Sequence, residues 1–272
     1  MPTWLLYTSA SVAGAIGSTL LFFFVVTRGA LLVRVALGGQ SSDVAHVYPV
    51  YSNMRLIRLV DFQPVISAIL LFQYDRLVSA ITSELRRLDL RGKDVMITSC
   101  AFGSVIPRVV STAMEAGARQ VLILDVIKNE LDHAREKLSE FEGHLVFLEE
   151  NCTAMKEEDG SVGANVIFFL LHELPHHLKG EALREAVRVL SPGGKLVLAE
   201  FHRPDGWLLR ALSWTYFKAF EPLGLALWNT HDPLKQLEDI GGLTCTRRTV
   251  FFGNFQITVA TKNPTVVANT PD

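Results

Sequence analysis

The sequence has no marked excess of either charge and few cysteines. Lysine and arginine total 26 against 28 aspartate and glutamate residues, so the formal net charge is −2. A nearly neutral chain gives no electrostatic reason to bind nucleic acid, and we expect no such partner. Cys100, Cys152 and Cys245 are odd in number and widely spaced. They form neither a disulfide framework nor a paired metal motif, which fits a reducing compartment.

Charge is also missing from the N-terminus. Residues 4–26 carry none, and residues 18–26 are strongly apolar. This run is longer than the roughly 20 residues of a membrane-spanning helix. Arg28 and Arg34 follow it, and the positive-inside rule then keeps the rest of the chain on the cytoplasmic or matrix side. A cleaved signal would need basic residues before the run. We therefore expect residues 1–43 to be a membrane-anchor segment and linker, with a helix lying in the membrane interface as the alternative.

The remainder of the chain changes pattern near Lys93. Before it, residues 44–92 show two helical patterns and are expected to form a helical cap. After it, apolar runs alternate with helical patterns. Strands are predicted at 94–99, 121–125, 145–148, 165–170 and 196–201, and helices at 105–116, 130–141 and 180–190. This alternation predicts an α/β fold with a mostly parallel sheet and helices on both faces.

The C-terminal part ends in a different arrangement. Strand-like runs at 243–252 and 255–261 flank Gly253-Asn254, a strong hairpin signal. A parallel sheet that ends in an antiparallel hairpin is the layout of the Rossmann-like class I S-adenosylmethionine (SAM) methyltransferases. We predict this fold for residues 93–262, preceded by an N-terminal hydrophobic helix and followed by a loose tail at 263–272.

Several residues occupy positions where a nucleotide cofactor would bind. The turn after the first strand holds Cys100 and Gly103, although it lacks the usual acidic-x-Gly-x-Gly run. An ordinary turn with a buried cysteine is the alternative reading of it. Asp125 ends the second strand, where a carboxylate can accept both ribose hydroxyls or cap the next helix. Asn151 follows the third strand, where many methyltransferases place an acidic residue at the adenine edge.

Titratable side chains follow the fourth and fifth strands. His172 and Glu173 come after one, and His202 after the other. Neighbouring parallel strands deliver such groups to one edge of the sheet, where they can act as a general base or hold a divalent metal. The segment from Trp207 to Trp228 is rich in aromatic and aliphatic residues. It is either an apolar lid over a lipophilic ligand or a helix packed on the sheet.

The body of the chain resembles the rhodoquinone biosynthesis proteins of the RquA type, relatives of the class I SAM methyltransferases. The motifs that carry the resemblance are Tyr48-Pro-Val-Tyr51, the helix from Ile69 to Leu77, Cys100-Ala-Phe-Gly103 with Pro107, Phe168-Phe-Leu-Leu-His-Glu173 with Pro175, His202-Arg-Pro204, Glu221-Pro222 with Leu227-Trp228, and Gly253-Asn-Phe-Gln256.

The resemblance implies an unusual reaction. SAM would donate an amino group that replaces a ring methoxy group of ubiquinone, with a divalent metal, manganese, assisting. It implies that His172, Glu173 and His202 supply the base and the metal ligands. It also implies that Tyr48, Tyr51, Gln73 and Trp228 meet the quinone, with Tyr51 close to the chemistry. The sequence departs from the family at Gln73, where asparagine is expected, and at Phe201, where tyrosine is expected.

Two other functions fit the same residues. One is an ordinary SAM-dependent methyltransferase acting on a quinone or another lipophilic acceptor. The other is a non-catalytic, membrane-anchored module that kept the fold and lost cofactor binding, which the single loop glycine favours. His172, Glu173 and His202 argue for an enzyme.

Overall fold

The computed structural model describes residues 51 and 53–264. Near the N-terminus it also describes residues 8, 11, 14 and 17–21, and these N-terminal residues are helical. Most of the predicted anchor segment, Tyr48 and most of the predicted tail lie outside these described residues. Within them, no single helix is both long and apolar enough to cross a bilayer. Helices α4 (Gln63–Ile69) and α5 (Tyr74–Leu85) meet that test only as a pair, bent by 94°.

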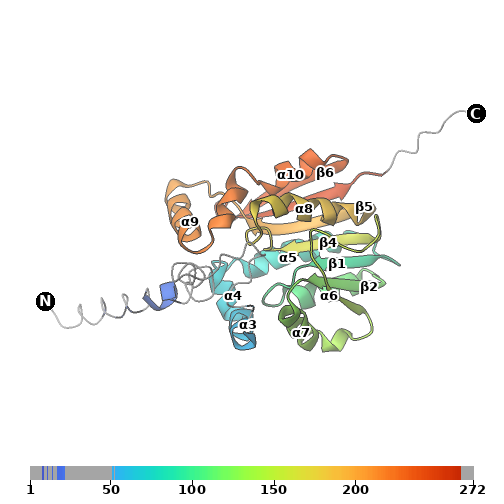
Figure 1. Cartoon of the computed structure of the whole chain (residues 1–272), viewed down its shortest axis with the longest axis horizontal. Coiled ribbons are helices and arrows are strands. Elements are labelled where there is room, and N and C mark those ends of the chain that lie inside the picture. Colours follow the sequence, from blue (N-terminus) through green and yellow to red (C-terminus); the bar gives the residue numbers. More distant parts are fainter. Residues whose placement is uncertain are drawn as a thin grey trace, which may run out of the picture.

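A seven-stranded sheet forms the centre of the molecule, in the order β3-β2-β1-β4-β5-β7-β6 (Figure 1). Strands β1 to β5 pair in parallel, and β7 pairs antiparallel with both β5 and β6. The predicted α/β fold with its C-terminal hairpin is therefore confirmed. The strands are β1 (Asp94–Thr98), β2 (Gln120–Asp125), β3 (Leu145–Glu149), β4 (Val162–Phe168), β5 (Leu190–Phe201), β6 (Leu243–Val250) and β7 (Phe255–Lys262).

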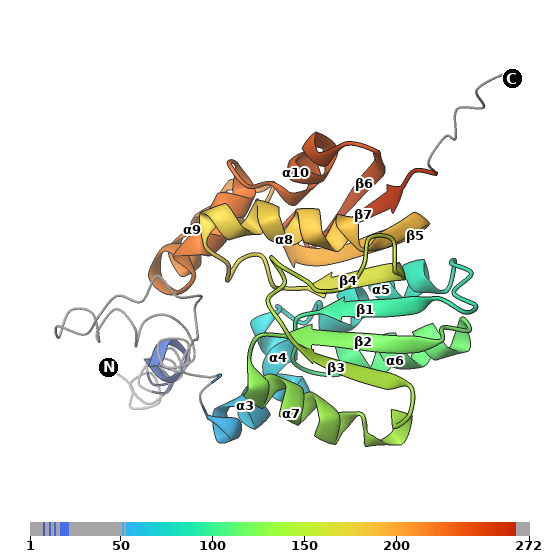
Figure 2. The same ribbon diagram turned by 45° about the vertical axis from the view of Figure 1, so that its right-hand side comes forward.

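Each face of the sheet has its own core, because successive residues of a strand point to opposite faces. In β1, Val95 and Ile97 belong to one core and Met96 to the other. The first face is covered by α5, α6 (Val105–Glu115) and α7 (Lys128–Lys137). The second is covered by α8 (His176–Arg188) and α10 (Pro233–Ile240) (Figure 2).

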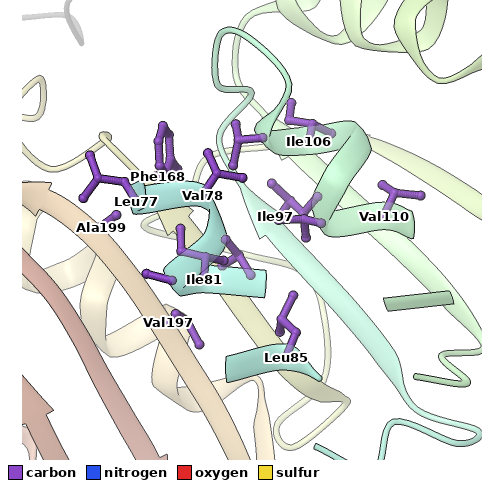
Figure 3. Close-up of a cluster of buried hydrophobic side chains, with 14 of the residues drawn as sticks. Leu77, Val78, Ile81, Leu85, Ile97, Ile106, Val110, Phe168, Val197 and Ala199 are labelled. Atoms are coloured by element: carbon purple, nitrogen blue, oxygen red, sulfur yellow. The ribbon is translucent and has the colours of Figure 1, made fainter. Parts of the chain in front are cut away.

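Helix α5 comes from the segment expected to form a cap, and it packs in the same core as the sheet. Leu77, Ile81 and Leu85 recur every four residues and are fully buried. Figure 3 shows them against side chains of the sheet and of α6, among them Ile97 and Val197. Each such side chain contributes roughly 1.5–3 kcal/mol through burial. The predicted boundary near residue 92 therefore does not separate two cores.

The elements that surround the carboxyl edge of the sheet are helical. Figure 2 shows α3 (Met54–Asp61), α4 and α9 (Trp207–Phe220) on the side to which the parallel strands point. Short 3₁₀ turns, η2 (Ser139–Phe141) and η3 (Pro222–Trp228), complete the fold. Helix α8 begins at His176, earlier than the predicted residue 180, because Pro175 occupies its N-cap position.

Candidate active site

Two adjoining cavities lie at the carboxyl edge of the parallel strands, the edge that binds ligands in open α/β sheets. The histidine cavity measures about 120 Å³ and contains His172. The aspartate cavity measures about 60 Å³ and contains Asp125. Tyr51, Ser99, Cys100 and Glu173 line both cavities. The two therefore form one continuous site with these four residues at its middle.

His172 is held by a buried carboxylate from the neighbouring strand. Its Nδ1 lies 3.1 Å from Oε1 of Glu200, and its backbone N–H donates to Oε2 of the same residue at 3.2 Å. Glu200 is completely buried. Burial alone would lower the pKa of His172, but Glu200, with smaller effects from Glu173 and Glu221, raises it to about 9. His172 is therefore an imidazolium at neutral pH and a hydrogen-bond donor rather than a base.

Glu173 can accept a proton, whereas His172 acts as a donor. Burial raises its pKa to about 7, and His172 and Tyr51 limit that rise. The Tyr51 hydroxyl donates to Glu173 Oε1 at 2.6 Å, and His172 Nε2 lies 3.8 Å from the same oxygen. A carboxylate that titrates near neutral pH is suited to accept a proton and return it. Glu173 therefore has the properties of a general base at the junction of the two cavities.

A buried lysine fixes the loop that carries both residues. Lys179 on α8 is completely buried, and its Nζ donates to the carbonyls of Leu171 and Leu174. Leu171 and Leu174 flank His172 and Glu173 in the chain. The position of the pair is therefore set by α8 and not only by the end of β4.

Asp125 lies at the end of β2, as predicted, in the aspartate cavity. Its carboxylate accepts the backbone N–H of Cys100 at 2.7 Å and that of Ile127 at 2.8 Å. The Ser99 hydroxyl lies 3.3 Å away. Burial raises the pKa of Asp125, and these donors oppose the rise. Asp125 thus joins the ends of β1 and β2 while it lines the cavity. The N-cap position of α7 is Ile127 and no described side chain caps that helix, so the predicted capping role of Asp125 is not confirmed.

Glu130 is a second acidic residue of the aspartate cavity. It lies in the first turn of α7, it is 3% exposed, and its Oε1 has no hydrogen-bond partner among the described residues. Burial, with Asp125 and Glu173 nearby, raises its pKa to about 9. Glu130 is therefore a neutral carboxyl at pH 7, and it can donate a hydrogen bond to a ligand in this cavity.

Side chains of other elements of the protein bind the backbone of the loop after β1. The Gly103 N–H donates to Asp61 at 2.8 Å, and Lys137 Nζ donates to the Gly103 carbonyl at 2.7 Å. Gly103 has φ +79°, and a Cβ there would come within 2.5 Å of the Tyr74 hydroxyl. Glycine is needed at position 103 for this close packing. Cys100, in the same loop, lines both cavities as predicted.

Three predicted ligand-binding residues lie away from both cavities. Asn151 is exposed, and its side chain accepts from the N–H and hydroxyl of Thr153. The Gln73 side chain donates to the Leu71 carbonyl at 3.2 Å. Trp228 packs edge-on against Phe217 and lines a separate open groove with Arg203 and Arg210. The structure therefore brings none of these three to the junction that Tyr51 occupies.

His202 also lies apart from the site. Its backbone N–H donates to the Asn254 carbonyl, and its Nδ1 lies 2.8 Å from the Gly253 carbonyl. Pairing with the β6–β7 hairpin thus turns it away, and it lines neither cavity. The predicted metal set of His172, Glu173 and His202 is not assembled. The described part of the chain contains no group of three His, Cys, Asp or Glu side chains arranged to hold a metal ion. These residues do not fit a metal site, and we assign no step to manganese.

Five polar residues of the site were not among the predicted site residues, and one of them, Ser99, lines both cavities beside Asp125. Glu200 had a usable signal, because it is the only charged residue in the apolar run of β5 from Leu196 to Phe201. Glu130 had a weaker one, since α7 is polar along much of its length. Tyr216 and Glu221 line the histidine cavity from the end of α9. Their placement depends on how the C-terminal end of α9 meets the carboxyl edge of the sheet, which no local pattern shows.

Comparison with known proteins gives a family match and partial relatives. Residues 59–239 match the model of the ubiE/COQ5 methyltransferase family. A ubiquinone/menaquinone biosynthesis C-methyltransferase (UbiE) from Ectopseudomonas mendocina (strain ymp) is 30% identical over 123 residues, which are 44% of this chain and 47% of that protein. The corresponding protein of Pseudomonas fluorescens (strain SBW25) is 31% identical over 106 residues, 38% of this chain and 41% of its own length. The matches thus span about half the length of these relatives or less.

Solved structures support the fold independently of sequence. An O-methyltransferase family protein from Burkholderia thailandensis superposes with a TM-score of 0.57 at 15% identity, over 80% of this chain and 63% of that one. A SAM-dependent methyltransferase from Aquifex aeolicus superposes with a TM-score of 0.53 at 18% identity, over 77% of this chain and 98% of that one. At such low identity these similarities establish the fold alone.

Proposed function

The chain belongs to the ubiE/COQ5 methyltransferase family, and from that premise we propose that it is a SAM-dependent transferase that modifies the ring of a ubiquinone-like lipid. One observation carries the proposal: the Tyr51–Glu173 hydrogen bond of 2.6 Å lies where the two cavities meet. A base at that junction can serve a reaction between a molecule bound in one cavity and a molecule bound in the other.

The aspartate cavity suits the nucleoside part of SAM. Asp125 and the neutral carboxyl of Glu130 offer an acceptor and a donor to hydroxyl and ring nitrogen groups. The site as a whole is rich in carboxylates, because Glu173, Glu200 and Glu221 surround the single cation His172. SAM carries a positive sulfonium, and this surplus of carboxylate attracts it.

The histidine cavity suits a quinone ring. Aromatic side chains of Phe102, Phe169 and Phe201 line it, together with aliphatic side chains of α4. His172 lies among them, with its ring edge-on to Phe201 at 5.0 Å. A flat ring with polar oxygens fits an apolar slot that contains one cationic donor. In this position His172 would donate to a quinone oxygen and stabilise negative charge that develops there.

We assign the proton transfers to Glu173. In the reaction implied by the resemblance to the rhodoquinone biosynthesis proteins, the amine of SAM attacks the ring carbon that bears a methoxy group. The attacking nitrogen must lose a proton, and the departing methoxide must gain one to leave as methanol. Glu173 can accept the first proton and supply the second, since its pKa is about 7. The nitrogen is then bonded both to the ring and to Cα of SAM. The N–H and Cα–H hydrogens pass to the quinone, which is reduced to the quinol as an N=Cα bond forms, and water hydrolyses this imine to the aminoquinol and the 2-oxo acid derived from SAM. Tyr51 orients the carboxylate through its hydrogen bond.

Methyl transfer to the ring is the second candidate, and the family match favours it. In that reaction the ring carbon takes the methyl group of SAM and releases its own proton to a base. The same Glu173 serves, and S-adenosylhomocysteine leaves. The two reactions therefore use one site and differ in the product.

Product mass separates these candidates. We would incubate the purified full chain with SAM and short-chain ubiquinone, and separately with a quinol that has an open ring position. Replacement of methoxy by amino makes the quinone lighter, whereas methylation makes the quinol heavier and releases S-adenosylhomocysteine. Absence of both products, together with no SAM binding by calorimetry, would contradict the proposed function and support a non-catalytic module.

A further inference from the structure

Helix α9 is apolar and almost uncovered. It has 14 residues, and only Phe217 is buried. Trp207 and Leu212 are 79% and 61% exposed, and Leu208 and Trp214 are exposed by half or more. A helix in water normally turns such residues toward the protein. Figure 1 shows α9 standing out from the body of the molecule at one end. An exposed surface of this kind marks an interaction site.

The charges on this helix have one sign. Residues 207–220 include Arg210 and Lys218 and no acidic residue, and the exposed Arg203 and Asp205 precede them. Lys218 Nζ lies 5.7 Å from the centre of the Trp214 ring. Tryptophan beside lysine and arginine is the combination that occupies the interface of a bilayer, where the rings meet the headgroups and the cations meet anionic lipid.

A second exposed apolar pair lies next to the histidine cavity. Ile69 and Leu70 line that cavity, and the next two residues, Leu71 and Phe72, are 39% and 80% exposed. Both have positive φ, 52° and 58°. Non-glycine residues adopt this conformation at a cost of about 1–3 kcal/mol each, and they do so mostly at functional sites. On the other side Tyr216 of α9 lines the same cavity. The exposed residues of α9 and of the α4–α5 turn therefore flank one cavity.

We propose that the exposed face of α9, together with Leu71 and Phe72, is a docking surface for an anionic phospholipid bilayer. We call it the α9 surface. Its apolar side chains enter the interface, Arg203 and Lys218 meet lipid phosphates, and the histidine cavity faces the membrane. Arg210 donates to the carbonyls of Pro204 and Asp205 and supports the start of the helix. The basic charge selects this occupant over a second copy of the chain, since two identical basic faces repel each other. The inference does not depend on which group the enzyme transfers.

Tryptophan fluorescence tests the contact directly. The four tryptophans are Trp4, Trp207, Trp214 and Trp228. In the full chain with Trp4→Phe, we expect vesicles of phosphatidylcholine and phosphatidylglycerol to shift the emission to the blue. We also expect brominated lipid to quench it. The quenched part should disappear when Trp207→Phe and Trp214→Phe are added. Emission from Trp207 and Trp214 that stays unquenched while the protein floats with vesicles would overturn the proposal.

A charge substitution tests the energetics. In the full chain with Trp4→Phe, adding Leu208→Asp and Leu212→Asp should reduce the quenching of Trp207 and Trp214 by brominated anionic vesicles at least about 10-fold, because two apolar anchors are lost and two negative charges face anionic lipid. This readout reports the contact of α9 even where residues 1–43 hold the chain on the vesicle. Thr246→Asp, on the exposed part of β6, is the matched control and should leave this quenching unchanged. Equal quenching of Trp207 and Trp214 in all three proteins would overturn the proposal, as would a lipid-independent dimer that Leu208→Asp and Leu212→Asp abolish. Activity on detergent-dispersed quinone is measured in parallel, so failure of the proposed function is seen separately.

Discussion

Replacement of Glu200 by glutamine should convert His172 from a cation to a neutral imidazole at pH 7. Glu200 holds the His172 ring at 3.1 Å, and it also accepts the backbone N–H of Phe201 at 2.8 Å. Glutamine keeps the size and an acceptor oxygen but removes the negative charge. The pKa of His172 should then fall from about 9 to below about 7, because burial outweighs the remaining attraction of Glu173 and Glu221.

The same change has a defined effect on stability. A pKa of about 9 against an ordinary 6.5 corresponds to roughly 3 kcal/mol of preference for the imidazolium in the folded state. Because the folded-state pKa is raised, this stability is fully present below pH 6.5 and is lost as the pH rises to about 9. Glu200→Gln should therefore lower the free energy of unfolding by about 3 kcal/mol near pH 6 and by much less above about pH 9.

The assay is an NMR titration of the histidine side chains together with urea unfolding at the two pH values. Glu149→Gln, which removes an exposed carboxylate at the end of β3, is the matched control and should leave both results unchanged. A His172 midpoint that stays near 9 in folded Glu200→Gln would refute the assignment of Glu200 as the main partner of the imidazolium.

Three further substitutions test other parts of the account. Tyr51→Phe removes the hydrogen bond that limits the pKa of Glu173. The acidic limb of the kcat/KM profile should therefore move from about pH 7 to higher pH, by roughly one pH unit. A limb that does not move would exclude Glu173 as the base. Glu130→Gln should raise the free energy of unfolding at pH 7 by up to about 3 kcal/mol and change it little at pH 4.5. The reason is that a protein with a carboxyl group of raised pKa becomes less stable as the pH rises from 4.5 to about 9 and the group must ionise. An equal change in the free energy of unfolding at the two pH values would contradict this. Lys137→Met breaks a half-buried ion pair of 2.6 Å with Asp61 and should lower the free energy of unfolding in urea by about 3 kcal/mol. Arg58→Met, in an exposed pair with Glu136, should lower it by under about 1 kcal/mol. Similar losses of stability in the two variants would show that the Asp61–Lys137 pair does not fix the loop.

The sheet could be predicted because its signal is local. Apolar runs such as residues 94–99 and 121–125 agree with β1 and β2 to within one residue. Asp125, His172 and Glu173 were placed correctly after the ends of strands. Parallel pairing makes those ends meet at one edge whatever the rest of the chain does.

The errors came from contacts between distant parts of the chain. His202 looked equivalent to His172 because both follow strands, but the β6–β7 hairpin binds it through Gly253. Glu200, two residues earlier, is the residue that reaches the site. Gly103 looked like a residue that approaches a cofactor, yet Asp61 and Lys137, more than 30 positions away, take its backbone groups. Side-chain contacts of this range leave no trace in local periodicity.

The central claim is that the aspartate and histidine cavities form one site divided by Tyr51 and Glu173. A crystal structure of the full chain with S-adenosylhomocysteine and a short-chain ubiquinone tests it most directly. The account predicts the nucleoside beside Asp125 and Glu130, and the quinone ring beside His172 and Phe201, with the two ligands facing each other across Glu173. A quinone bound outside the histidine cavity, or a nucleoside bound away from Asp125, would contradict it.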